Sequence, residues 1–272
     1  MPSGPAAQKG SETLPPWLAG RWPGGDPPCL IQAELSMIHC EWGRQGIEAL
    51  KDRVAVLVIV DVLSFSTAVD VALQRGACVL PFPYGDEGAA RAAAEAAGAH
   101  LARPRRTGRE SLSLSPASLE RLQAGDRILL PSPNGSRLSL SGGACAVLTA
   151  CLRNAPAVAA QAREIAAAHD VAVIPAGERW PDGSLRPAIE DLLGAGAVVA
   201  ALDLPASAEA RVALGAFRAA GPDLPDLVRA SVSGRELASA GFAEDVEMAI
   251  RTGVSGTAPL LRDGAYSDSN TV

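Results

Sequence analysis

Val54–Val60, a run of seven aliphatic residues, constrains the fold more than any other stretch of this chain. The run has the length and the β-branched character of a strand, and it is far too short to span a membrane. A strand that is apolar on both faces typically lies inside a parallel sheet, with helices covering each side. The run therefore predicts a layered α/β domain with this strand near its centre.

Short apolar runs of the same kind recur along the chain and alternate with segments of helical periodicity. We expect strands at 31–39, 78–82, 127–130, 145–149 and 171–175, and helices at 44–50, 65–74, 87–97, 155–168 and 187–201. Beyond residue 206 the pattern is mostly helical, and residues 260–272 are expected to form only a short ending with a polar tail. The alternation predicts an α/β fold in which a mostly parallel or mixed sheet is covered by helices on both faces.

Residues 1–28 differ from the rest of the chain because they are rich in Pro and Gly and have no apolar period. Such a composition is typical of a disordered or loosely packed tail. Residues 29–272 show no internal repeat and no clear linker. We therefore expect a single α/β domain over residues 29–272.

Charge, hydropathy and cysteine usage exclude several classes of protein. A net charge of −6 argues against a nucleic-acid surface, which needs a basic stripe. The chain has no run of 18 apolar residues and no secretory signal pattern, so we expect no membrane association. Its five cysteines form no CxxC pair and no zinc-ligand spacing, which is typical of reduced, buried cysteines. These observations together predict a cytoplasmic protein.

Polar residues follow the central strand at the point where it ends. Asp61 comes directly after the apolar run, and Ser64, Ser66 and Thr67 follow it. Open α/β sheets place their ligands at the carboxyl ends of strands and at the helix starts beyond them. The alternative is purely structural, with Asp61 ending the strand and Ser64 or Ser66 capping the helix.

Two other strand ends carry small polar or acidic residues. They are Ser132, Asn134, Gly135 and Ser136 after the strand at 127–130, and Gly177 and Glu178 after the strand at 171–175. Backbone N–H groups exposed at such a turn favour an anion, and a glycine lets the anion approach closely. Asn-Gly is also a common turn signal, so the motif taken singly is weak.

Glu190 and Asp191 lie in the first turn of the helix expected at 187–201. Acidic residues there suit the helix dipole, which is a structural explanation. Adjacent carboxylates that reach a pocket could instead bind a hard divalent cation. If the three strand ends meet, the crevice holds carboxylates, hydroxyls and N–H groups, a set that suits a metal-bound phosphate ester.

A basic loop stands out in this acidic chain. Arg103, Arg105, Arg106 and Arg109 lie within seven positions and show no clear period. Guanidinium groups could clamp an anionic substrate there through paired hydrogen bonds. A solvated surface loop is the alternative.

Four segments together resemble a known family. They are VIVDVLSFSTAVDVALQRGA at 58–77, SPNGSR at 132–137, IPAGERWPDGSLRPAIEDLLGAGAVV at 174–199 and EDVEMAI at 244–250. In that order they resemble the 2-phosphosulfolactate phosphatase (ComB) family, over roughly residues 50–262. The resemblance implies a ComB-like α/β fold and a homodimer. It also implies a magnesium-dependent phosphatase that converts 2-phosphosulfolactate to sulfolactate and phosphate.

The resemblance and the strand-end pattern together suggest roles for individual residues. Under this hypothesis Asp61 and Glu178 are catalytic, Asp61, Glu190 and Asp191 hold Mg²⁺, and Ser66, Thr67, Ser132, Asn134, Gly135, Ser136 and Arg137 bind the substrate. The metal draws charge from the phosphoryl oxygens and activates a water. Direct attack by water is favoured over an aspartyl-phosphate route of the haloacid-dehalogenase kind. That route needs a second Asp two residues after the first, where this chain has Leu63.

Four positions depart from the pattern of the family. Ser64 stands where an Arg is typical, Leu114 where the family has Asn, and Pro133 and Ser136 where it has Thr. Because Arg and Asn are groups that hold sulfonate or phosphate, these changes leave two alternatives open. One is a phosphatase for a different small phosphorylated carboxylate. The other is a relative that binds a phosphorylated metabolite without catalysis.

Overall fold

The computed structural model describes residues 36–104 and 111–269. The tail predicted at 1–28 and the first part of the strand predicted at 31–39 lie outside the described residues. So do three of the four arginines of the basic loop, Arg105, Arg106 and Arg109.

The predicted central strand is β2 (Val56–Val60), and all five of its residues are buried. It pairs in parallel with β7 (Val171–Pro175) on one side and with β6 (Ala146–Ala150) on the other. Beyond β7 lies β1 (Ile38–Cys40), which is also parallel. The prediction of a buried strand inside a parallel sheet is confirmed.

The remaining parallel strands form a second group within the same sheet. β5 (Arg127–Ser132) pairs with β3 (Cys78–Pro83) on one side and with β4 (His100–Leu101) on the other. The order of the whole nine-stranded sheet is β1-β7-β2-β6-β10-β11-β3-β5-β4. A separate two-stranded hairpin, β8 (Glu178–Arg179) with β9 (Leu185–Arg186), follows β7 along the chain.

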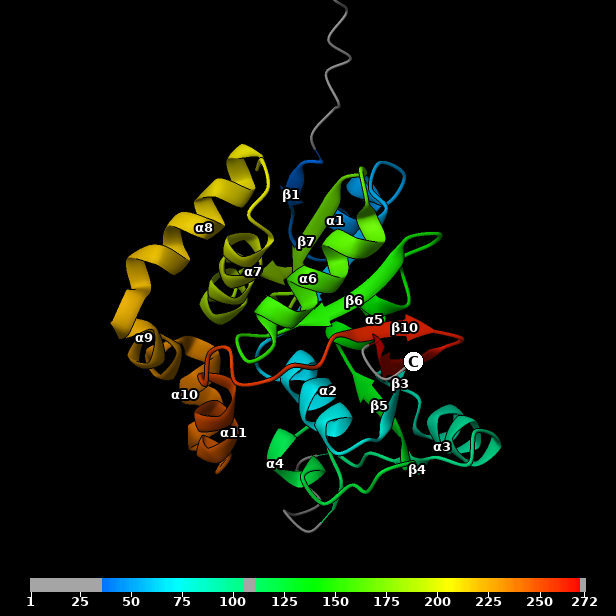
Figure 1. Ribbon diagram of the computed structural model, residues 1–272. Helices are drawn as coiled ribbons and strands as arrows, with labels where there is room; N and C mark the ends of the chain where they lie inside the picture. Colours follow the sequence, from blue (N-terminus) through cyan, green and yellow to red (C-terminus); the bar gives the residue numbers. More distant parts are fainter. Residues whose placement is uncertain (1–35, 105–110, 270–272) are drawn as a thin grey trace, which may run out of the picture. The chain divides into compact units, whose positions relative to one another are not determined.

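An antiparallel hairpin joins the two parallel groups, and here the prediction of a short polar ending was wrong. β10 (Pro259–Arg262) and β11 (Ala265–Asp268) lie between β6 and β3, as the red strands in Figure 1 show. The turn between them, Asp263-Gly264, has positive φ at both residues, as a tight hairpin turn requires. The hairpin was not predicted from the sequence because its two strands are short, although Asp-Gly between apolar residues is a recognised hairpin signal.

Alternate residues of β2 point into two different cores, one on each face of the sheet. Val56, Val58 and Val60 belong to the core that includes residues of α6, α7 and α8. Leu57 and Ile59 belong to the core that includes residues of α1, α2 and α5. Helices therefore cover both faces, as predicted from the apolar run.

The helices of the described residues follow the chain in order. They are α1 (Gly43–Leu50), α2 (Phe65–Gln74), α3 (Glu87–Ala96), α4 (Pro116–Leu119), α5 (Gly135–Ser139), α6 (Ala155–Ala166), α7 (Ile189–Leu202), α8 (Ala208–Ala220), α9 (Leu224–Ala230), α10 (Val232–Ser239) and α11 (Ala243–Ala249). The helices α8 to α11 confirm the helical character expected beyond residue 206 (Figure 1). Within 36–104 and 111–269 no helix has the length and hydropathy to cross a bilayer.

Candidate active site

Asp61 links the starts of two helices at the carboxyl end of β2. It is only 6% exposed. Its Oδ1 accepts a hydrogen bond from the N–H of Phe65 at 3.2 Å, and its Oδ2 accepts one from the N–H of Gly135 at 2.9 Å. The carboxylate thus connects the first residue of α2 with the first residue of α5.

Gly135 makes this contact possible because no larger residue fits there. A Cβ atom at this position would lie 2.2 Å from Cδ1 of Phe65. Four strands separate β5 from β2 in the sheet, so pairing of neighbouring strands does not bring the two ends together. Instead α5, which follows β5, packs across the sheet against β2 and β3.

Helix α7 brings two more carboxylates to the same place. Gly194 allows the close approach, since a Cβ there would lie 2.7 Å from Cγ2 of Val62 and 2.8 Å from Cγ1 of Val60. One turn earlier, Glu190 and Asp191 are 2% and 3% exposed. The predicted first-turn position of both acids is confirmed.

Asp191 connects the loops that follow β2 and β7. Its Oδ1 accepts a hydrogen bond from the N–H of Val62, and its Oδ2 accepts one from the N–H of Gly177, both at 2.8 Å. Burial and the charges of Asp61 and Glu190 raise the pKa of Asp191 well above its usual range. Asp191 therefore holds the ends of β2 and β7 next to each other beside the site.

Glu178 completes the group of four carboxylates, which we call the carboxylate cluster (Asp61, Glu178, Glu190, Asp191). The side-chain amide of Asn134 donates a hydrogen bond to Oε2 of Glu178 at 2.9 Å. Burial, and then the charge of Asp61, raise the pKa of Glu178 to about 7. A carboxyl group that titrates near neutral pH can both donate and accept a proton, as general acid–base catalysis requires.

The cluster and the end of β5 each contain an unsatisfied polar group. Among the described residues, Oε2 of Glu190 and Oγ of Ser132 are buried and have no hydrogen-bond partner. Buried polar groups without a partner are rare and need an explanation, such as a bound ion or ligand. A cation beside Glu190 would satisfy its oxygen and offset the mutual repulsion of the carboxylates.

The donor set fits Mg²⁺ that is held jointly with a substrate. No group of three or more His, Cys, Asp or Glu side chains in the described part of the chain is arranged to hold a metal ion by itself. Mg²⁺ does not need such a cage, because it keeps several waters and binds through one or two carboxylates and substrate phosphate oxygens. Asp61 and Glu190 offer such a pair.

The predicted hydroxyl ligands Ser66, Thr67 and Ser136 bond within the protein. Oγ of Ser66 accepts a hydrogen bond from the N–H of Asp61 at 2.9 Å and lies 2.7 Å from Oγ1 of Thr149. Oγ1 of Thr67 donates to the carbonyl of Val62, and Oγ of Ser136 donates to that of Leu130, both at 2.8 Å. These hydroxyls order the strand-end loops, and their role as substrate ligands stays a prediction.

The predicted arginines lie elsewhere. The side chain of Arg137 is exposed and donates to the carbonyl of Tyr84 at 2.9 Å, away from the cluster. Arg103 lines a separate cavity beyond Pro133. Thr149, which forms a hydrogen bond with Ser66, was not predicted as a site residue. It lies inside the apolar run CAVLT, where a single threonine gives no functional signal.

Comparison of the sequence with known proteins identifies its family. The profile of the 2-phosphosulpholactate phosphatase family matches residues 45–264. A 2-phosphosulfolactate phosphatase from Methanothermobacter thermautotrophicus is 37% identical over 142 residues, which are 52% of this chain and 58% of that protein. The match to this relative thus spans less than two thirds of the relative's length. Since the family profile covers most of the chain, including every residue of the carboxylate cluster, the chain belongs to the 2-phosphosulpholactate phosphatase family.

Proposed function

We propose that this protein is a magnesium-dependent phosphatase that hydrolyses 2-phosphosulfolactate to sulfolactate and phosphate. The observation that carries the proposal is the buried carboxylate cluster, which lies against the backbone N–H of Gly135 and the amide of Asn134 in a chain of this family. The reaction class of the relative, as its name states it, supports the same assignment.

Each residue of the cluster has a role in this proposal. Asp61 and Glu190 would hold Mg²⁺, which when bound draws charge from the phosphoryl oxygens and lowers the pKa of a coordinated water. Glu178, oriented by Asn134, transfers the proton between the attacking water and the leaving oxygen. Asp191 positions the loops that carry Asp61 and Glu178. The N–H of Gly135 donates to Asp61, so the N–H groups that follow it at the start of α5 orient the phosphoryl group.

The test is phosphate release from racemic 2-phosphosulfolactate by the purified protein, with Mg²⁺ and with EDTA. We expect turnover only with Mg²⁺. Asp61→Asn should lower kcat by on the order of 10³-fold, the effect typical of losing one electrostatic group at a reacting centre. Mg²⁺ should also raise the Tm of the unmodified protein and leave that of Asp61→Asn unchanged.

Asp203→Asn is the matched control, because Asp203 is an exposed residue in a left-handed conformation that Asn also adopts. It should keep full activity. Turnover in EDTA equal to that in Mg²⁺ would contradict the metal dependence, and full activity of Asp61→Asn would remove Asp61 from the mechanism.

A second candidate is a phosphatase for another small phosphorylated carboxylate. It is favoured by Ser64, a buried residue at the position where the resemblance leads one to expect an arginine. Parallel assays with phospholactate and phosphoglycolate distinguish the two, since the better substrate has the larger kcat/KM.

The homodimer and the cytoplasmic location, together with the single domain over residues 29–272, are part of the proposal. The dimer rests on the family resemblance, and light scattering coupled to size-exclusion chromatography measures it directly. A monomer mass at micromolar concentration would contradict it.

A further inference from the structure

The hairpin of β8 and β9 lies next to the carboxylate cluster, and the proposed reaction uses only its first residue, Glu178. Gly177, directly before the hairpin, donates its N–H to Asp191 at 2.8 Å. A Cβ atom at Gly177 would lie 2.7 Å from Cδ1 of Leu185 and 2.9 Å from the carbonyl oxygen of Arg186. The returning strand of the hairpin is therefore packed against a residue that bonds to the cluster.

Arg186 and Glu178 are neighbours across this hairpin. They are paired in the antiparallel register of β8 and β9, so their side chains leave the same face. Alternation along the chain places Trp180 on that face too and Arg179 on the opposite one. Burial and the charge of Asp61 raise the pKa of Glu178, whereas the charge of Arg186 lowers it. The guanidinium thus acts electrostatically on a member of the cluster.

The guanidinium of Arg186 is held in place and keeps donors that no described residue uses. It lies over the ring of Trp180, 5.8 Å from the ring centroid, and its Nη2 donates to Oε2 of Glu236 at 3.4 Å. The side chain of Arg186 is only 11% exposed, whereas that of Glu236 is 65% exposed. Within residues 36–104 and 111–269, its Nε and Nη1 have no hydrogen-bond partner. A largely buried guanidinium with unused N–H groups suits an anion that accepts two parallel hydrogen bonds.

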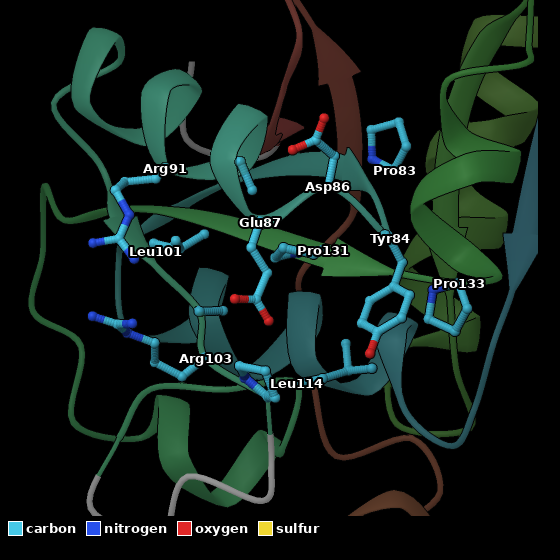
Figure 2. A pocket seen from close by; sticks show the side chains of 14 residues that line it. Pro83, Tyr84, Asp86, Glu87, Arg91, Leu101, Arg103, Leu114, Pro131 and Pro133 are labelled. Atoms are coloured by element: carbon cyan, nitrogen blue, oxygen red, sulfur yellow. The ribbon is translucent and has the colours of Figure 1, made fainter.

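Two other arginines near the site have a different environment. Arg91 and Arg103 line a separate cavity of about 520 Å³, where they lie on the same side (Figure 2). Asp86 and Glu87 line that cavity as well, so its two guanidinium groups are matched by two carboxylates. Arg186 differs from both, because its partner across the hairpin belongs to the carboxylate cluster.

We propose that Arg186 binds the phosphoryl group of the substrate and stabilises the negative charge of its oxygens during hydrolysis. The proposal rests on the proposed phosphatase function. Enzymes of phosphoryl transfer place positive groups against these oxygens, and arginine is a frequent choice. Ser64, buried and neutral, stands where the resemblance leads one to expect an arginine. Arg186 supplies the positive charge from the β8–β9 hairpin instead, and Trp180 and Glu236 hold its guanidinium.

The test compares Arg186→Met with Arg179→Met in the phosphate-release assay with Mg²⁺. Arg179 is the matched control, since it lies on the same hairpin, faces the other way and is exposed. We expect kcat/KM to fall on the order of 10²-fold in Arg186→Met, as for the loss of one group that stabilises developing charge. Arg179→Met should keep full activity. Arg186→Lys, which retains the charge without the planar fork, should recover part of the loss.

Product inhibition distinguishes phosphoryl binding from a structural role. Inorganic phosphate occupies the place of the phosphoryl group, whereas sulfolactate has no phosphoryl group. In Arg186→Met the inhibition constant of phosphate should rise at least about 10-fold, as expected for a lost hydrogen bond to a charged group, and that of sulfolactate should stay the same. An equal rise of both constants, a rise for sulfolactate alone, or an unchanged kcat/KM would overturn the proposal.

A protein that hydrolyses no ester at all would contradict the phosphatase function, and Arg186 is then tested by calorimetric titration with inorganic phosphate. Binding that is weakened in Arg186→Met and kept in Arg179→Met supports the phosphoryl site. Absence of binding to the unmodified protein, or equal binding by the two variants, overturns it. Circular dichroism verifies that both variants fold.

Discussion

At the scale of single residues, the site depends on carboxylates that are held close together and largely buried. Glu178 shows the consequence most clearly. Burial and the charge of Asp61 raise its pKa from 4.5 to about 7. The folded protein therefore binds a proton at Glu178 that the unfolded chain releases between these two pH values.

This linkage predicts how stability depends on pH. A raised carboxyl pKa means that the folded state binds more protons than the unfolded state, so this contribution to the free energy of unfolding falls as pH rises from about 4.5 to about 7. In EDTA, Glu178→Gln should have a higher Tm than the unmodified protein at pH 8, and the difference should vanish at pH 4.5. Thermal melts at both pH values measure it.

Glu164→Gln, on an exposed position of α6, serves as the control for that experiment and should show no such pH-dependent difference. If Glu178→Gln were no more stable than the unmodified protein at pH 8, the ionised carboxylate of Glu178 would not destabilise the folded state, and its raised pKa would be contradicted.

At the scale of elements, two close approaches build the site, one between a helix and a strand and one between two helices. Gly194 lets α7 lie against β2, and Gly135 lets α5 lie against Phe65 of α2. Both glycines have the same function. The absence of a side chain lets two elements approach closely enough to bring a carboxylate into the site. The sequence pattern suggested that Gly135 lets an anion approach the backbone closely, whereas in the structure its missing side chain makes room for the ring of Phe65.

Gly135→Ala tests this explanation. Its Cβ would lie 2.2 Å from the ring of Phe65, so α5 must move away from Asp61. We expect a loss of about 2 kcal/mol in the free energy of unfolding, as overpacking typically costs, together with a large fall in activity. Urea denaturation and the phosphate-release assay measure the two effects.

Gly215→Ala provides the comparison, because a Cβ at this position in α8 meets nothing within 4 Å. It should be neutral or slightly stabilising, as alanine favours a helix more than glycine does. A Gly135→Ala protein that is as stable and active as Gly215→Ala would show that α5 does not depend on this close contact.

At the scale of the whole molecule, the C-terminal hairpin makes one sheet out of two parallel groups. Leu260 of β10 lies opposite Leu148 of β6, and Tyr266 of β11 lies opposite Val79 of β3. Tyr266 is fully buried, its ring is 6.1 Å from that of Phe65, and its hydroxyl donates to Ser139 at 2.7 Å. The hairpin thus contacts both α2 and α5, which carry the site.

Tyr266→Ala should therefore destabilise the molecule and not only its C-terminus. Removing a large buried aromatic side chain costs about 3–5 kcal/mol. Hydrogen exchange should become faster in β10, β11 and β3. Tyr266→Phe, which removes only the hydroxyl, should cost about 1 kcal/mol. Faster exchange confined to β10 and β11 in the alanine variant would show that the hairpin does not join the two groups.

The buried ion pair between Arg153 and Asp70 supports the same connection. Nε of Arg153 lies 2.6 Å from Oδ2 of Asp70. Ser255 and Thr257, just before β10, donate to Oδ1 of the same carboxylate at 2.5 Å and 2.6 Å. These bonds attach the segment that leads into the hairpin to α2. The sequence gives no sign of this network, because its members are up to 187 positions apart.

The sequence by itself determined the features that depend on local pattern. The apolar run that became β2, the glycine and polar residues after each strand, and the acids in the first turn of α7 all follow from short-range periodicity and side-chain chemistry. These features were sufficient for the fold class and for the members of the carboxylate cluster.

Only the tertiary structure decided which of those residues come together in the site and which form hydrogen bonds outside it. Asp61 contacts Gly135 because α5 crosses back over the sheet. Ser66 instead bonds to Thr149 of β6, Thr67 bonds to Val62, and Arg137 lies away from the cluster. The hairpin within the sheet and the cavity beyond Pro133 also arise from contacts between distant segments. Local propensity and spacing contain no information on such contacts, since these are set by how buried surfaces of separate elements pack together.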